Sequence, residues 1–484
     1  MQNREQPRIV VIGAGMSGIL SVIKLREAGY RDITVYEKAD RLGGTWRDNT
    51  YPGLTCDVPS HLYRYTFAAN PDWSRRFPPG EEIRGYFESV AARYEVPGHI
   101  RFNCEITRAR LEQDGWHLTL ASGESDRADI VIAATGVLRE PVYPDIPGLA
   151  DFAGPCFHSA RWDHATTLKD KRVGIIGTGS TGVQIVSAIV DETAHLSLFQ
   201  RTPQWILPLP NPEIPEEQKA HFRRDPEAME ALYFDLAERF QNTFARAVIG
   251  DREELARIEK ACRDNLEENV HDPELRRRLT PDYTAACKRL IMSDAFYPAM
   301  QKPDVSLVTD DIERIEPAGV RTKDGTLHEL DVLVLATGFD GHAFMRPMQV
   351  AGESGLDLEE AWQDSIEAYR SVAVPGFPNF FMLVGPNSPI GNFSLIMISE
   401  MQLDYVLQLM DRARQAPQGR IAPTAAATRR FNDDVREAMK NTVWVSGCRS
   451  WYLDKNGNPA MWPWSFERFQ ADMAQPVWDD FALR

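Results

Sequence analysis

Two copies of one pattern constrain the fold of this chain more than any other feature. Residues 8–38 read RIVVIGAGMSGILSVIKLREAGYRDITVYEK: an apolar run, a glycine-rich turn, a helix pattern and a second apolar run. Residues 171–201, KRVGIIGTGSTGVQIVSAIVDETAHLSLFQR, repeat that order. Short apolar runs bounded by turns are typical of buried parallel strands. The sequence therefore predicts an α/β fold with two Rossmann-like dinucleotide-binding domains.

Each glycine-rich turn has the spacing that a dinucleotide requires. The triplets are Gly13, Gly15 and Gly18 in the first unit and Gly177, Gly179 and Gly182 in the second. The first glycine makes the tight turn, the second lets the backbone approach a pyrophosphate, and the third lets helix and strand pack closely. The helix that follows presents its positive dipole end to the phosphates. Both turns are candidate nucleotide sites, the second with Thr178, Ser180 and Thr181.

The residue that ends the second strand differs between the two units. Glu37 ends the first, and a carboxylate there accepts hydrogen bonds from a ribose diol. Gln200, Arg201 and Thr202 end the second. An arginine pairs with the 2′-phosphate that a carboxylate would repel. The first site therefore suits FAD and the second NADPH, unless Arg201 is exposed there by chance.

The rest of the chain divides around these units. DIVIAATG (129–136) and DVLVLATG (331–338) predict the closing strand of each domain, and the first puts Ala134, Thr135 and Gly136 at the FAD site. The glutamate-, arginine- and alanine-rich stretch between them predicts a helical insertion in the NADPH domain. We expect a discontinuous FAD domain (1–150 and 340–484), a linker (151–170), an NADPH domain (171–210 and 286–339) and the insertion (211–285).

Composition excludes several classes of protein. The 484 residues carry a net charge of −16, which argues against a general nucleic-acid or anionic-membrane binder. No apolar run approaches the ~20 residues of a membrane span, and no apolar leader precedes the first strand. We therefore expect a cytoplasmic protein with no nucleic-acid or membrane partner. The six cysteines form neither a C-x-x-C pair nor a zinc-spaced cluster, so we expect inert or buried thiols and no metal site.

Two further stretches carry a family resemblance. GGTWRDNTYPGLTCD (43–57) matches a pattern of class B flavoprotein monooxygenases of the Baeyer–Villiger type (type I), through Gly44, Trp46, Tyr51, Pro52, Gly53 and Asp57. FAGPCFHSARWD (152–163) matches their second pattern through Phe152, Gly154, His158, Trp162 and Asp163. Disulfide reductases share the two domains but need a redox-active cysteine pair. Flavin-containing monooxygenases of amines and sulfides usually have Tyr or Phe where Trp162 stands.

The resemblance implies an NADPH- and O₂-dependent enzyme that converts a ketone to an ester or lactone. It would act through a peroxyflavin anion and a tetrahedral adduct, with NADP⁺ retained during oxygenation. A fixed positive charge must stabilise the oxyanion, and water must be kept out. The alternatives are a heteroatom (S or N) oxygenase and an uncoupled NADPH oxidase. The ketone and the oligomeric state cannot be read from the sequence.

The resemblance also implies residue roles. Arg289 would be the catalytic arginine and Asp57 its partner, while Lys288 would join Arg201 and Thr202 around the 2′-phosphate. Flavin contacts would come from Gly44, Thr45, Trp46 and Tyr63, and Trp451 would close over NADP. By residue type alone, Lys288-Arg289 is a solvated basic pair, Asp57 a loop cap and the aromatic residues packing residues. His158 fits a latch at the domain crossing better than an acid or base, because protonating the peroxide would stop the reaction.

Overall fold

Both glycine-rich units form parallel sheets in the computed structural model, which describes residues 6–454, 456–458 and 460–484. The first sheet has the order β19 (Phe380–Met382), β7 (Ile130–Ala133), β1 (Ile9–Ile12), β2 (Ile33–Tyr36) and β3 (Ile100–Arg101). The second has the order β13 (Val305–Val308), β10 (His195–Phe199), β9 (Arg172–Ile176), β17 (Val332–Leu335) and β8 (Cys156–His158). All neighbouring strands in both sheets run parallel. The predicted α/β fold with two Rossmann-like sheets is confirmed.

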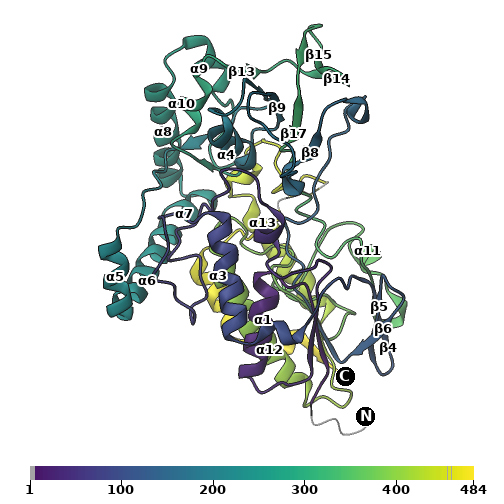
Figure 1. Cartoon of the computed structure of the whole chain (residues 1–484). Coiled ribbons are helices and arrows are strands. Elements are labelled where there is room, and N and C mark those ends of the chain that lie inside the picture. The colour runs from purple at the N-terminus through teal and green to yellow at the C-terminus, as the bar shows by residue number, and fades with distance from the viewer. Residues whose placement is uncertain (1–5, 455, 459) are drawn as a thin grey trace.

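Helices pack against both sheets because the central strands are largely apolar. β1 and β17 are buried at every residue, which is typical of parallel strands covered on both faces. α1 (Met16–Glu27) begins after the first glycine-rich turn and packs against α3 (Gly80–Arg93) and α12 (Leu395–Ala413). α4 (Ser180–Ile189) takes the corresponding place after the second turn and packs against α10 (Phe296–Met300). The two sheets lie in the lower and upper halves of the molecule (Figure 1).

Smaller elements complete the two halves. An antiparallel meander of β4 (Ile106–Glu112), β5 (Gly115–Leu120) and β6 (Ser125–Ala128) is extended by β18 (Gln349–Ala351). The other small sheets join β14 (Ile312–Glu316), β15 (Gly319–Thr322) and β16 (Leu327–Glu329), β11 (Ile206–Leu207) and β12 (Ile291–Met292), and β20 (Ile421–Pro423) and β21 (Phe481–Leu483). The remaining helices outside the insertion are α2 (Thr45–Asp48), α11 (Leu358–Ala361), α13 (Ala425–Met439) and α14 (Phe466–Ala474). No helix in the described part of the chain is long and apolar enough to cross a membrane.

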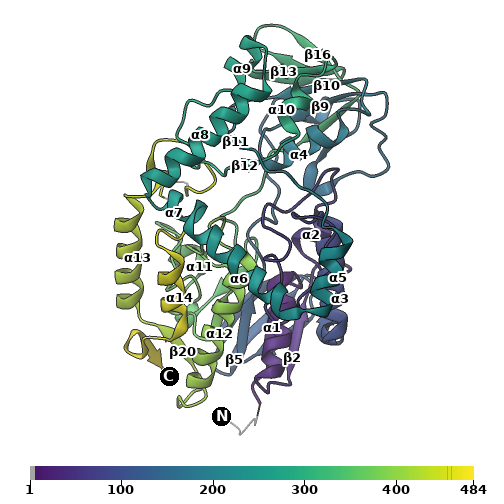
Figure 2. The same cartoon turned by 90° about the vertical axis from the view of Figure 1, so that its left-hand side faces the viewer.

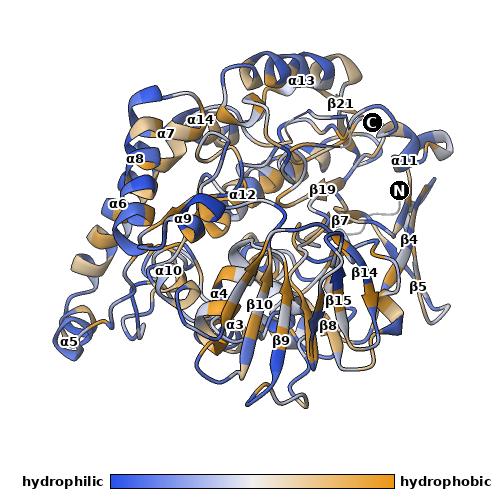
Figure 3. Cartoon of the chain, turned by 90° about the horizontal axis from the view of Figure 1, so that it is seen from above, coloured by the Kyte–Doolittle hydropathy of each residue, from blue (hydrophilic) through white to orange (hydrophobic). Residues whose placement is uncertain are grey.

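The charged stretch after β11 is helical, as predicted. It consists of α5 (Glu216–Arg224), α6 (Pro226–Asn242), α7 (Phe244–Val248), α8 (Arg252–Asn269) and α9 (Pro273–Leu279). α8 and α9 lie beside the upper sheet, whereas α5 and α6 lie at the side of the lower half (Figures 1 and 2). Arg64 fixes this lower contact, because its fully buried guanidinium donates to Glu230 at 2.8 Å and lies over the Tyr233 ring. Seen from above, polar residues predominate on α5 and α9, while apolar residues follow β9 and β10 (Figure 3).

Residues 151–170, which the sequence suggests are a linker, contain a strand of the second sheet. Cys156–His158 form β8, the edge strand beside β17. A strand of three residues directly after Pro155 is too short to show an apolar pattern, so composition alone gives no sign of it. The chain segments that join the two halves also pair with each other. Val142 N–H donates to the carbonyl of Gly338, and Asp340 N–H donates to that of Glu140, both at 2.9 Å.

The expectation that all six cysteines are inert thiols is wrong for two of them. Cys287 and Cys448 form a disulfide bond between positions 161 residues apart in the sequence. Such a separation produces no spacing motif, so the sequence could not suggest the pair. Cys56 and Cys262 are buried thiols, Cys104 is half-buried and Cys156 is exposed. The disulfide links the segment of Lys288 and Arg289 to the loop that carries Trp451.

Candidate active site

A cavity of about 560 Å³ lies between the two halves and is lined by residues of both glycine-rich turns. Phe240 of the insertion and Trp451 of the C-terminal part also line it. The predicted site residues on its wall are Gly13, Gly15, Glu37, Gly44, Thr45, Trp46, Asp57, Tyr63, Ala134, Thr135, Gly136, Gly179, Ser180, Thr181, Lys288, Arg289 and Trp451. The predicted residues outside its described lining are Gly18, Gly177, Thr178, Gly182, Arg201, Thr202, Phe152, Gly154, His158, Trp162 and Asp163.

The first glycine-rich turn leaves room for a backbone-bound pyrophosphate. Gly13 has a φ of +102°, a conformation that glycine adopts at little cost. A Cβ on Gly18 would lie 1.9 Å from the Gly13 carbonyl oxygen, so α1 reaches the turn only because residue 18 has no side chain. Gly15 and Gly44 both line the cavity and lie next to each other, because a Cβ on Gly15 would lie 3.5 Å from Gly44 Cα. These positions form a cradle that fits the phosphates of FAD.

Glu37 directly follows β2 and lies on the cavity wall, as the ribose-binding role requires. Its buried carboxylate accepts hydrogen bonds from Ala14 N–H at 2.8 Å and Ala39 N–H at 2.9 Å. Arg47, which the sequence did not single out, lies 3.0 Å from the same carboxylate. These contacts hold Glu37 in one orientation. Oε1 faces both Ala39 and Arg47, whereas Oε2 accepts from Ala14 and has a second lone pair for a ribose hydroxyl.

The second turn repeats this geometry beside a group of cations. A Cβ on Gly182 would lie 2.2 Å from the Gly177 carbonyl oxygen. Thr178 Oγ1 donates to the Thr202 carbonyl at 2.9 Å, which holds the end of β10 against the turn. Lys288 lies over the Tyr283 ring, 4.6 Å from its centroid. Burial and the positive charge of Arg201 lower the pKa of Lys288, so these cations lie close enough to repel each other. The donor set fits the 2′-phosphate of NADPH.

Arg289 and Asp57 form an ion pair on the cavity wall. Arg289 Nε donates to Asp57 Oδ2 at 3.1 Å, and Nη2 donates to the same oxygen. The two side chains are 32% and 26% exposed, and this exposure faces the cavity that both residues line. Burial disfavours the charged guanidinium, but Asp57 outweighs it and raises the pKa of Arg289 above its ordinary value. Arg289 is therefore a permanent positive charge next to both nucleotide cradles.

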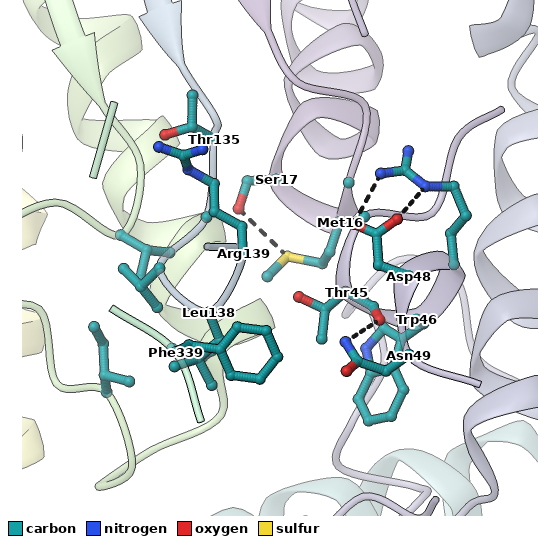
Figure 4. A pocket seen from close by; sticks show the side chains of 18 of the residues that line it. Met16, Ser17, Thr45, Trp46, Asp48, Asn49, Thr135, Leu138, Arg139 and Phe339 are labelled. Carbon is teal, nitrogen blue, oxygen red and sulfur yellow. Dashed lines mark hydrogen bonds and ion pairs between the residues drawn. The ribbon is translucent and has the colours of Figure 1, made fainter. Parts of the chain in front are cut away.

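Aromatic and small polar side chains shape the remaining wall. Trp46 Nε1 donates to the Tyr63 hydroxyl at 3.1 Å, and their rings meet edge to face. Thr45 and Trp46 of α2, with Asn49 just after it, lie across the cavity from Leu138 and Phe339, and Met16 lies between the two groups (Figure 4). Leu138 and Phe339 come from the two segments that join the halves. The cavity therefore lies directly at the domain crossing.

Known proteins share these features over the whole chain. A family profile described as FMO-like, flavin-binding monooxygenase-like, matches residues 6–213. A Baeyer–Villiger monooxygenase of Streptomyces coelicolor is 41% identical, covering 97% of this chain and 91% of the relative. The chain belongs to the Baeyer–Villiger monooxygenase family. The predicted resemblance is confirmed, and the protein is an FAD- and NADPH-dependent flavin monooxygenase, an oxidoreductase.

Two other matches extend the relationship. An uncharacterised monooxygenase of Mycobacterium tuberculosis is 47% identical, covering 99% of this chain and 96% of the relative. The crystal structure of cyclohexanone monooxygenase from Rhodococcus sp. Phi1 bound to NADP⁺ has a TM-score of 0.89. It is 30% identical to this monooxygenase, with 99% of each chain covered. The whole architecture of the chain is therefore that of a known monooxygenase.

The first family pattern of this monooxygenase also connects its two halves. Tyr51 OH donates to Gln184 Oε1 on α4 at 2.9 Å, and burial raises the pKa of Tyr51 to about 12. Gln184 Nε2 donates to the Thr55 carbonyl at 3.1 Å. A Cβ on Gly53 would lie 2.6 Å from the Gln184 carbonyl oxygen, so only glycine allows this approach. Part of the pattern thus fixes one nucleotide unit against the other.

The second family pattern packs away from the cavity. Phe152 belongs to an apolar cluster with β9, β10 and β17, and Trp162 packs edge to face on Phe157. A Cβ on Gly154 would lie 2.3 Å from the Asp331 carbonyl oxygen. Asp163 accepts hydrogen bonds from Ala165 N–H and the Thr166 hydroxyl, as a loop-capping aspartate does. These residues stabilise the crossing instead of contacting the cavity.

His158 lies at the centre of that crossing. Its ring is fully buried, 5.4 Å from the Tyr143 ring and 5.9 Å from the Phe339 ring. Nδ1 accepts a hydrogen bond from Ala160 N–H, which puts the proton of the neutral ring on Nε2. Burial lowers the pKa of His158, so the imidazole is uncharged at neutral pH. Tyr143 and Phe339 belong to the two different joining segments.

The sequence did not single out Tyr452 or Gly391. Tyr452 is buried beside the Arg289 guanidinium, and Gly391 lines the cavity next to both. A tyrosine that follows a predicted cofactor tryptophan, Trp451, carries no signal of its own. Trp451 itself lies on the cavity wall, its ring against Gly341, and His342 Nε2 lies 2.9 Å from its carbonyl oxygen.

Proposed function

We propose that this monooxygenase inserts one oxygen atom beside a ketone carbonyl and gives an ester or lactone. The balanced reaction takes up a ketone, O₂, NADPH and a proton and releases the ester, NADP⁺ and water. When bound, FAD supplies the redox chemistry that takes hydride from NADPH and activates O₂. The observation that carries the proposal is the Arg289–Asp57 pair on the cavity wall between the two nucleotide cradles. An arginine there meets the need for a fixed positive charge.

Arg289 stabilises the negative charge that develops on the carbonyl oxygen during the reaction. Its raised pKa keeps it protonated at neutral pH. Asp57 holds the Nε and Nη2 edge of the guanidinium, which leaves Nη1 free of this ion pair. Trp46, Tyr63 and Phe240 make much of the adjoining wall apolar and aromatic. Such a wall excludes water that would divert the activated oxygen.

The two cofactors are assigned to the two halves. FAD binds through Gly13, Gly15, Gly18, Glu37, Gly44, Thr45, Trp46, Asp57, Tyr63, Ala134, Thr135 and Gly136, in a domain of residues 1–150 and 340–484. NADPH binds through Gly177, Thr178, Gly179, Ser180, Thr181, Gly182, Arg201, Thr202, Lys288 and Arg289, in a domain of residues 171–210 and 286–339. Trp451 covers bound NADP⁺ and retains it during oxygenation, which its place on the cavity wall supports.

The enzyme works in the cytoplasm on a small-molecule ketone of any size class and on O₂, and it binds neither nucleic acid nor a membrane. The net charge of −16 supports the last point, because nucleic acids and anionic membranes would be repelled.

Replacing Arg201 or Lys288 by alanine is expected to raise KM for NADPH about tenfold to hundredfold. A hydrogen-bonded contact to a charged group contributes about 1.5–3 kcal/mol, and each 1.4 kcal/mol is about tenfold. NADH lacks the 2′-phosphate, so its KM serves as the internal control and stays unchanged. Because the pKa of Lys288 is lowered, NADPH affinity should start to fall at a lower pH than an ordinary lysine would give. Equal changes for NADPH and NADH in steady-state kinetics would refute the assignment.

His158 acts as a latch at the domain crossing: it holds together the two chain segments that join the halves. Its ring between Tyr143 and Phe339, and the paired backbone of residues 138–143 and 336–340, support this role. Replacing His158 by alanine is expected to at least double the share of NADPH that is oxidised without product, since Phe339 on the cavity wall loses its support. NADPH consumption and ester yield measure this share. Wild-type coupling in a variant with full FAD content would show that His158 has no such role.

The function is tested by mixing the protein with NADPH, air and a panel of ketones and sulfides, and identifying the products by mass spectrometry. Esters or lactones support the proposal. Sulfoxides alone would show a heteroatom oxygenase, and hydrogen peroxide alone an NADPH oxidase.

A further inference from the structure

We propose that Tyr452 is a positioning residue, which holds the Arg289 guanidinium from the side that Asp57 does not reach. The inference rests on the proposed function, because it concerns the charge that this function assigns to Arg289. The observation behind it is that three groups, from distant parts of the sequence, surround one guanidinium: Asp57, Tyr452 and the backbone of Gly391.

Tyr452 and Arg289 meet at one point beside Gly391. A Cβ on Gly391 would lie 3.0 Å from Arg289 Nη1 and 3.0 Å from the Tyr452 hydroxyl oxygen. Asp57 takes the opposite edge of the guanidinium, through Nε and Nη2. Nη1 is therefore the nitrogen that faces Tyr452. Gly391 has a φ of +90°, so its backbone conformation also favours the absence of a side chain here.

The hydroxyl of Tyr452 is held in place by its surroundings. Tyr452 is 3% exposed, and its ring packs against Trp451 at 4.5 Å and Trp444 at 5.8 Å between centroids. Ala460 N–H donates to its carbonyl at 2.8 Å. The disulfide between Cys287 and Cys448 ties the start of this loop to a point two residues before Arg289. The phenol therefore reaches the guanidinium from a fixed support.

A phenol suits this position better than a second carboxylate. Its oxygen accepts a hydrogen bond from a guanidinium N–H without cancelling the positive charge. Burial raises the pKa of Tyr452, so the phenol is protonated and neutral at physiological pH. Gly391 and Trp451, and not Tyr452, form the described cavity lining beside Arg289. Tyr452 therefore acts through Arg289 and does not touch the reacting groups.

The test compares Tyr452→Phe with Tyr369→Phe and the wild type. Tyr369 is a matched control: it is also buried, and its hydroxyl donates to Asp480 at 2.6 Å, outside the cavity. We expect Tyr452→Phe to keep its FAD, its rate of flavin reduction by NADPH and its KM for the ketone within twofold. Its kcat for ester formation should fall about tenfold, with hydrogen peroxide accounting for the missing product. Tyr369→Phe should match the wild type.

Two results would overturn the role of Tyr452. One is an ester yield per NADPH in Tyr452→Phe equal to that of the wild type. The other is loss of FAD or of folding in Tyr452→Phe, which would make the hydroxyl a general structural element. Failure of the proposed function is separate, because the wild type would then make no ester from any ketone tested.

Discussion

The variant Arg289→Ala is expected to lose ester formation by at least about a hundredfold in kcat and to go on oxidising NADPH. Removing one preorganised donor from a developing oxyanion typically costs about 10²–10³ in kcat. Arg289 is a charged donor on the cavity wall, and its raised pKa keeps it protonated at neutral pH. The electrons from NADPH then leave as hydrogen peroxide. Ester and peroxide yields per NADPH measure the effect.

Two controls make this result specific to Arg289. Arg289→Lys keeps a positive charge but cannot donate to Asp57 Oδ2 from two nitrogens in a fixed plane, so an intermediate loss is expected. Arg314→Ala removes an exposed guanidinium outside the cavity and should leave kcat unchanged. Ester formation by Arg289→Ala within tenfold of the wild type would contradict the role given to this residue.

The second large effect separates the two nucleotide sites. Gly18→Ala should yield a colourless protein without FAD, because the added carbon would lie 1.9 Å from the Gly13 carbonyl oxygen. Gly182→Ala should remain yellow but need about tenfold to hundredfold more NADPH, because its added carbon would lie 2.2 Å from the Gly177 carbonyl oxygen. Forcing extra volume into a packed contact costs about 1–3 kcal/mol, and a loss of binding free energy of that size corresponds to the predicted change in the NADPH requirement. The absorption spectrum and KM for NADPH measure the two effects.

Gly85→Ala is the matched control for both glycine variants. Gly85 lies in α3, and nothing stands within 4 Å of an added Cβ, so this variant should bind both cofactors as the wild type does. An exchange of the two phenotypes, with Gly182→Ala colourless and Gly18→Ala yellow, would reverse the assignment of the sites. Full binding of both cofactors in both variants would refute the cradle geometry.

The parts of the fold that the sequence predicted are those set by local pattern. Runs such as IVVI become buried parallel strands because every residue in them is apolar, and the glycine spacing fixes each turn before its helix. The helical insertion followed from its charged composition. β8 escaped prediction because three residues cannot show a period, and the Cys287–Cys448 disulfide because 161 residues separate the two.

The site residues divide in the same way, into those that a local sequence pattern predicts and those that it does not. Glu37 and Arg201 could be read from their positions at strand ends, whereas Asp57 and Arg289 came only from the family resemblance. Gly391 and Tyr452 were missed because each matters through a contact with Arg289, which is distant in sequence, and Arg47 because its contact with Glu37 follows no spacing pattern. The residues of the second family pattern were found by motif, yet they pack at the domain crossing and not around the cavity. A motif can thus identify a family without marking the residues that meet its substrate.

The most direct measurement follows the oxygen atoms. The protein is mixed with NADPH, a ketone found by the product screen and ¹⁸O₂, and the ester is analysed by mass spectrometry together with the NADPH consumed. The account predicts one ¹⁸O per ester, in the bridging position beside the former carbonyl carbon, and one NADPH oxidised per ester formed. An ester without ¹⁸O, or NADPH oxidation that yields only hydrogen peroxide with every ketone and with FAD bound, would contradict it.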